Sequence, residues 1–178
     1  MARLYFVTGA GVSAASALMY CVVPMHATPA MRAVAVAACL LLALIFVVGD
    51  VLARQRPLDR VVLKTGWATV LTIFIVSVAI GAGLRAPNLG FLAIIICIVS
   101  VLTDVRKGLD VALGCAGAML ALAVAEHSQW LPIANADGRD LLPVHLLMHL
   151  MVLIAAWVAG LLMSRLIGRT LSDLKERE

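Results

Sequence analysis

The sequence predicts an all-α, polytopic membrane protein built as a bundle of six transmembrane helices. Hydrophobic residues make up 63% of the 178 residues, charged residues make up only 13%, and the mean hydropathy is +1.07. A soluble domain is about 45–50% apolar and about 25% charged, so this chain has too little polar surface to cover a water-soluble fold. The composition also argues against a disulfide-stapled secreted module, a disordered tail and a protein that binds nucleic acid.

Three apolar runs in the first half of the chain can each cross a bilayer, whose hydrocarbon core needs about 20 apolar residues per helix. The first run is closed by Pro24, the second carries Asp50 in its last turn, and the third begins near Lys64, whose long side chain can reach the membrane surface. We expect these helices over residues 4–23, 33–53 and 61–83.

Three further runs fill the second half. The fourth is short and interrupted only by Asp104, the fifth ends at Glu126, and the sixth follows Pro143. We expect these helices over residues 88–105, 109–126 and 144–167. A helix satisfies every backbone hydrogen bond within its own segment, which is why we expect helices rather than irregular chain in lipid.

The distribution of Lys and Arg predicts that both termini are cytoplasmic, since cytoplasmic loops of membrane proteins are enriched in these residues. One side of the predicted topology holds Arg3, Arg54, Arg56, Arg60, Lys64, Arg106, Lys107, Arg165, Arg169, Lys175 and Arg177. The other side holds only Arg32, Arg85 and Arg139. We therefore expect a multi-pass protein of the bacterial inner (plasma) membrane.

The four histidines are predicted to lie toward the outer face. They are His26, His127, His145 and His149, with Met25 and Met148 beside two of them. His145 and His149 are one helical turn apart on one face of the sixth helix, a spacing that can hold a metal or offer an imidazole to haem iron. We therefore treat these six residues as candidate ligands, for haem b first and for copper or another metal second. Histidines at a membrane surface that bind nothing are the alternative.

A stripe of small residues follows the sixth helix at every fourth position: Ala156, Gly160, Ser164 and Gly168. Small residues let another helix approach closely, as in GxxxG pairs. The stripe is compatible with packing inside one bundle and with packing between two protomers. Because it shares a face with His149, Gly160 and Ser164 are candidates for coupling an outer site to the rest of the helix.

The end of the chain predicts a helix that leaves the membrane. Ile167, Leu171 and Leu174 are spaced as in a heptad seam, and charged residues fill the other positions. We interpret residues 1–167 as a transmembrane sensor domain and residues 168–178 as the start of a cytoplasmic signalling helix, with Leu171 and Leu174 as coupling residues and the output domain absent from this chain. A basic anchor beside the membrane is the alternative.

The chain resembles the six-helix membrane input domains that precede histidine-kinase or diguanylate-cyclase modules in bacterial signalling proteins. The resemblance covers roughly residues 60–178. The residues that carry it are Pro87 and Gly90, Arg106-Lys107-Gly108, Glu126 with Leu131-Pro132, Arg165-Leu166, and Arg169-Thr170-Leu171 with Leu174. It implies a dimeric sensor whose last helix drives a cytoplasmic enzyme.

These observations lead to three functional hypotheses. The first is a sensory input domain that responds to a small-molecule or redox signal near the outer face, works as a homodimer, and passes the change along the sixth helix to an output domain. The second is a b-type membrane cytochrome that carries electrons. The third is a small transporter subunit, which the lack of a charged residue in the middle of any predicted span disfavours. The motifs of a kinase or cyclase are missing, so we expect no catalytic activity from this chain itself.

Overall fold

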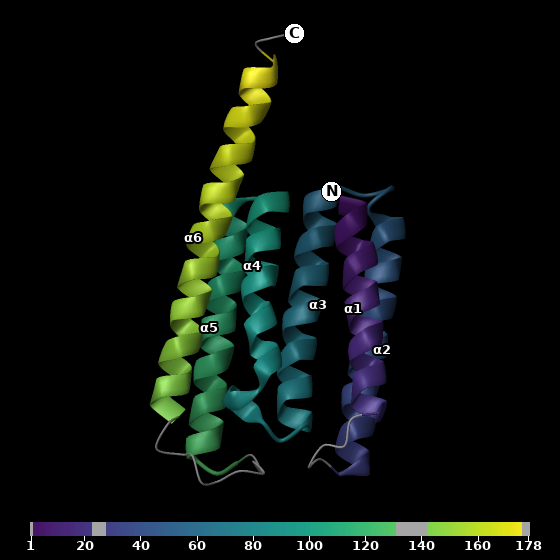
Figure 1. Ribbon diagram of the computed structural model, residues 1–178, viewed down its shortest axis with the longest axis vertical. Helices are drawn as coiled ribbons and strands as arrows, with labels where there is room; N and C mark the ends of the chain where they lie inside the picture. Colours follow the sequence, from purple (N-terminus) through teal and green to yellow (C-terminus); the bar gives the residue numbers. More distant parts are fainter. Residues whose placement is uncertain (1, 23–27, 131–141, 176–178) are drawn as a thin grey trace.

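The computed structural model describes residues 2–22, 28–130 and 142–175, and every regular element in these ranges is helical (Figure 1). There are six α-helices and two short 3₁₀ helices among them. In chain order they are α1 (Ala2–Val22), α2 (Pro29–Leu52), α3 (Leu58–Ala79), η1 (Gly83–Arg85), η2 (Pro87–Gly90), α4 (Phe91–Leu102), α5 (Val105–His127) and α6 (Leu142–Lys175). The predicted all-α fold is therefore confirmed for the described residues.

The helices run side by side between two ends of the bundle. We call the end at which α1 begins and beyond which α6 projects the tail end, and the opposite end the far end (Figure 1). At the tail end the Lys107 Nζ of α5 lies 2.6 Å from the Asp59 Oδ2 of α3. Because these residues lie in the first turns of their helices, α3 and α5 both start at the tail end, and α4 runs back to it from the far end.

Five of the described helices, α1, α2, α3, α5 and α6, are long and apolar enough to cross a membrane by length and composition. The fourth apolar stretch, Asn88–Leu102, is shorter. The length of a span is set by the hydrocarbon thickness of about 30 Å, which a helix covers at about 1.5 Å per residue. The chain therefore has the helices of a membrane protein, with α4 as the unusual one.

The connection between α3 and α4 differs from the predicted boundaries. The sequence predicts a third helix up to Gly83 and a fourth from Asn88, whereas α3 ends at Ala79 and α4 begins at Phe91. Gly81 and Gly83 have φ angles of 69° and 53°, a left-handed conformation that glycine adopts without steric cost. The chain therefore leaves the helix there and returns through η1 and η2, which are largely buried.

The pair of α1 and α2 is held by two aromatic rings that fill the space above two glycines. A Cβ added at Gly9 would lie 2.5 Å from the Phe46 ring, and one added at Gly49 would lie 2.8 Å from the Phe6 ring. Tyr5 packs edge-on against Phe46 with ring centroids 5.3 Å apart. The phenylalanine of each helix thus packs on a glycine of the other helix, and these two contacts fix how the helices are aligned.

Ser100 of α4 lies where α4, α5 and α6 come closest. A Cβ at Gly108 of α5 would lie 2.9 Å from the Ser100 Cβ, and one at Gly160 of α6 would lie 2.7 Å from it. The Cys97 thiol donates a hydrogen bond to the Ala156 carbonyl over 3.0 Å. Ala156 and Gly160 of the small-residue stripe therefore pack against α4 of the same chain, whereas a Cβ at Gly168 would meet no atom within 4 Å.

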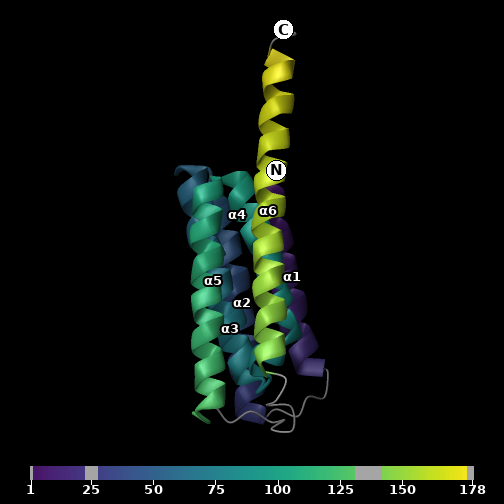
Figure 2. The same cartoon turned by 90° about the vertical axis from the view of Figure 1, so that its left-hand side faces the viewer.

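The last helix, α6, is a single element of 34 residues that extends past the other helices at the tail end (Figures 1 and 2). Its Trp157 Nε1 donates to the Val105 carbonyl over 3.4 Å, which ties it to the start of α5. The helix continues through Leu171 and Leu174, the positions of the predicted heptad seam. Its extent is greater than the predicted span of 144–167 at both ends.

Candidate functional site

Two polar side chains at the far end bind the backbone of one buried residue, Leu84 in η1. The Glu126 carboxylate of α5 accepts a hydrogen bond from the Leu84 N–H with a distance of 2.5 Å. The His149 Nε2 of α6 lies 2.9 Å from the Leu84 carbonyl oxygen. Because a carbonyl only accepts, His149 is the donor in this contact. We call Leu84, Glu126 and His149 the Leu84 clamp.

The end of α5 and the start of α6 place Glu126 and His149 beside η1. Glu126 lies in the last turn of α5 and is only 6% exposed, and His149 follows the start of α6 by about two turns. Leu84 itself is fully buried. A buried N–H or C=O without a partner costs about 1–3 kcal/mol. Because η1 is a single 3₁₀ turn, the Leu84 N–H and C=O find their partners on α5 and α6. The clamp therefore stabilises a buried 3₁₀ turn.

Two basic residues lie near the Glu126 carboxylate. Arg85, which follows Leu84, and His145, one turn before His149, both lie close enough to interact with it electrostatically. A carboxylate that is almost fully buried is costly unless opposite charges or hydrogen bonds offset the lost hydration. The far end thus joins α5, α6 and η1 through one charged and hydrogen-bonded group of side chains.

A second polar contact holds the following segment, η2, to α3. The Asn88 side-chain amide donates to the Ile73 carbonyl over 3.3 Å, and its oxygen lies 3.1 Å from the hydroxyl of the buried Ser77. The segment from Gly81 to Gly90 is therefore bound on both sides, by α3 through Asn88 and by α5 and α6 through Leu84.

The candidate residues predicted from the sequence have different positions in the structure. His149 belongs to the clamp, and His145 is half-buried beside Glu126. His127 is exposed at the end of α5, and the Met148 side chain is 61% exposed on α6. His26 and Met25 lie outside the residues that the structure describes.

No three His, Cys, Asp or Glu residues in the described ranges come together as a metal-binding group. The His149 Nε2 is directed at a carbonyl oxygen. The haem or metal cofactor stays a prediction from the sequence pattern.

Sequence reasoning alone missed the role of Glu126. A carboxylate at the end of an apolar helix is a signal in itself, because ionisable residues at membrane depth usually have a specific partner. Its partner, however, is a backbone N–H far away in the sequence, which carries no side-chain signature.

No family model, curated protein or solved structure matches this chain.

Proposed function

We propose that this chain is the membrane input domain of a bacterial signalling protein, in which a change at the far end moves α6. The far end faces the outside of the plasma membrane in this proposal, and both termini lie in the cytoplasm after six crossings. The partner is a cytoplasmic output domain of the histidine-kinase or diguanylate-cyclase type, and the working unit is a homodimer. The chain itself carries no catalytic activity.

The observation that supports the proposal is the continuity of α6. One helix runs without a break from His149 in the clamp to Lys175 beyond the tail end of the bundle. A helix of this kind is stiff along its axis, so a displacement or rotation at the clamp reaches its other end. The buried hydrogen bonds at Leu84 are discrete contacts that are either made or broken, as a two-state element requires.

The clamp offers a route for a signal. A ligand, a redox change or a change in protonation near Glu126 and His149 alters how strongly η1 is held to α6. If the clamp opens, α6 loses its contact with Leu84 while Gly160 remains packed against Ser100. The helix then pivots about its tail-end contacts, and the output domain receives the movement.

A fusion protein tests this proposal. Residues 1–178 are joined in frame to the catalytic domain of a diguanylate cyclase, and the activity is measured in membranes. Glu126→Gln and His149→Ala, which weaken the clamp, are expected to change the activity at least threefold relative to the unaltered fusion. The exposed His127→Ala variant is the matched control and is expected to leave the activity unchanged.

Insertions test the route through α6. A full heptad inserted after Gly168 adds about two turns and keeps the rotational phase of the helix, whereas an insertion of two residues rotates everything beyond it by about 200°. The heptad variant is expected to retain its response to the clamp substitutions, and the two-residue variant to lose or invert it. Equal activity in all of these fusions would contradict the proposal that α6 transmits a signal.

A further inference from the structure

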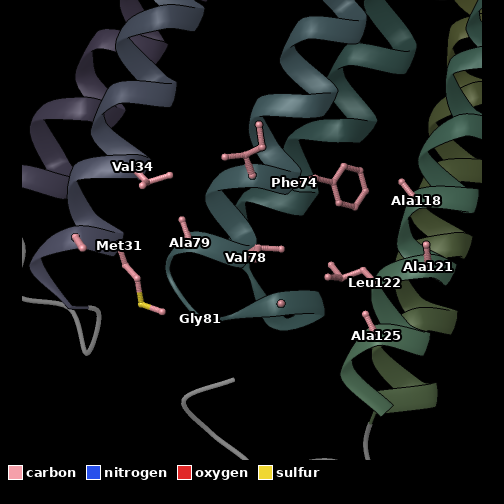
Figure 3. Close-up of a pocket in the computed structure, with 13 residues that line it drawn as sticks. Met31, Val34, Phe74, Val78, Ala79, Gly81, Ala118, Ala121, Leu122 and Ala125 are labelled. Atoms are coloured by element: carbon pink, nitrogen blue, oxygen red, sulfur yellow. The ribbon is translucent and has the colours of Figure 1, made fainter. Parts of the chain in front are cut away.

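An apolar groove with a volume of about 740 Å³ lies beside η1, between α2, α3 and α5 (Figure 3). Its size is within the range of about 300–1,000 Å³ that ligand pockets have. Met31 and Val34 of α2 form one wall, and Ala121 and Ala125 of α5 lie opposite them across α3. All of the residues that line this groove are apolar.

The groove opens sideways, away from the core. Val34 is 50% exposed, Ile75 is 41% exposed and Val78 is 37% exposed, although all three line it. The helices α2, α3 and α5 that carry the walls all have the length and composition of membrane spans. The opening therefore faces hydrocarbon rather than water, and what enters it from the side is an apolar chain.

The α5 wall is built from small residues, so the protein does not fill the space itself. Ala118, Ala121 and Ala125 recur along α5 at this wall, and Gly81 and Gly83 close the end next to η1. From Ala118 to Ala125 the wall is about 10 Å long, at about 1.5 Å per residue. This length matches the upper part of one lipid acyl chain within a leaflet of about 15 Å.

Two arginines adjoin lining residues of the groove in the sequence. Arg32 follows the lining residue Met31, and Arg85 comes two residues after the lining residue Gly83. Arg85 also interacts with the Glu126 carboxylate. An arginine carries five N–H donors, so it can bind a phosphate group while it keeps a partner within the protein. The chain segments that form this end of the groove therefore carry positive charge.

We propose that the groove binds an anionic phospholipid, with one acyl chain along α3 and the phosphate near Arg32 and Arg85. This proposal does not depend on a signalling function, because it needs only the groove, its exposure to lipid and the arginines. The bound chain contacts Gly83, which adjoins the Leu84 clamp. The lipid therefore supports the same buried segment that Glu126 and His149 hold.

Photolabelling in nanodiscs tests the proposal. The full chain is reconstituted with phosphatidylglycerol that carries a diazirine in the upper half of one acyl chain, and the labelled peptides are identified by mass spectrometry. We expect labels on α2, α3 and α5 at the groove. Ala121→Phe fills the groove and is expected to reduce this labelling at least fivefold, whereas Ala37→Phe, at an exposed alanine that does not line the groove, leaves it unchanged.

The head group is tested with the same probe built on phosphatidylcholine. Labelling by phosphatidylglycerol is expected to exceed labelling by phosphatidylcholine severalfold, and Arg32→Gln is expected to remove this preference, while Arg54→Gln at the tail end keeps it. Equal labelling of the unaltered and Ala121→Phe proteins overturns the site. Equal labelling by the two lipids, or displacement of both by a free fatty acid, overturns the assignment to an anionic phospholipid. Helix content and a monodisperse elution profile confirm that each variant is folded.

Discussion

The two ends of the α4, α5 and α6 group are held by different kinds of contact. At the tail end Ser100 is enclosed by Gly108 and Gly160, and backbones approach so closely that no side chain fits between them. At the far end Glu126 and His149 reach across to the backbone of Leu84. Atoms that are closely packed lose their contacts when the helices separate, whereas a group that loses a hydrogen bond within the protein can form one to water or to a ligand. The far end is therefore the part of this group that can change at low cost.

The α1 and α2 pair belongs with the tail end in this respect. Phe6 and Phe46 fill the spaces above Gly49 and Gly9, and no charged side chain takes part in these two contacts. The molecule thus has two closely packed regions, joined by α3, and one polar region at the far end that determines how α6 begins.

The largest effect is expected from Gly108→Leu, which inserts a side chain where α4 and α5 touch. Overpacking of this kind costs about 1–3 kcal/mol or more, which corresponds to roughly 2–12 °C in the melting temperature of a chain of this size. Gly117→Leu is the matched control, because a Cβ at Gly117 on the same helix meets nothing within 4 Å. Thermal unfolding in detergent measures both. Equal melting temperatures would remove the distinction between the two ends.

An effect that is at most as large, and that is confined to the far end, is expected from Glu126→Ala. The variant leaves the buried Leu84 N–H without its acceptor, which costs about 1–3 kcal/mol. Hydrogen–deuterium exchange is expected to increase over residues 81–90 and to stay unchanged around Ser100. Glu126→Gln retains an oxygen acceptor and is expected to show less than half of the increase. Faster exchange throughout α4 would mean that the two ends are not independent.

The His149→Ala substitution should have a still smaller effect, because it removes one hydrogen bond to a carbonyl that has a second lone pair. A net loss of about 0.5–1.5 kcal/mol is expected. The readouts are thermal unfolding and exchange of the first turns of α6. His127→Ala, at an exposed position, serves as the control and should match the unaltered protein. A loss equal to that of Glu126→Ala would show that the histidine does more than donate this bond.

The smallest effect concerns the ion pair of Asp59 and Lys107 at the tail end. Their side chains are 41% and 34% exposed, so solvent and salt screen the attraction, and only a small coupling energy is expected. A double-mutant cycle with Asp59→Asn and Lys107→Gln measures it. The coupling should fall toward zero in 1 M salt. A coupling that persists in salt would indicate that polar contacts hold the tail end as well.

The sequence predicts the positions of the helices well and their ends less well. Hydropathy places the fifth helix at residues 109–126, but α5 starts at Val105, because the Asp104 side chain accepts a hydrogen bond from the Arg106 N–H and caps the first turn. The first turn of α5 contains polar residues, so a hydropathy profile does not include it in the helix. Hydropathy also does not predict that the third helix ends before Gly81, because the cause is the positive φ angle of this glycine.

The candidate site was predicted only in part, for a physical reason. The pattern of His145 and His149 on one helix face is readable from their spacing, and it predicts a pair of haem or metal ligands there. What His149 contacts is a backbone oxygen on a segment whose place in the bundle depends on how the helices are ordered. The order of the helices in the bundle cannot be read from a single sequence. For the same reason the sequence does not predict that Gly160 packs against α4.

The register of α6 has a mechanical consequence for any assembly of two copies. Gly160, Ile167 and Leu174 fall on one helix face at heptad spacing, and at Gly160 this face is already covered by α4. A partner helix that joins the seam at Leu171 and Leu174 therefore lies beyond the tail end of the bundle and not beside it. A Cβ at Gly168 would meet no atom within 4 Å, so the contact with α4 has ended by that residue. One stretch of α6 thus packs on its own bundle, and the next stretch of the same straight helix is where a second copy can pack.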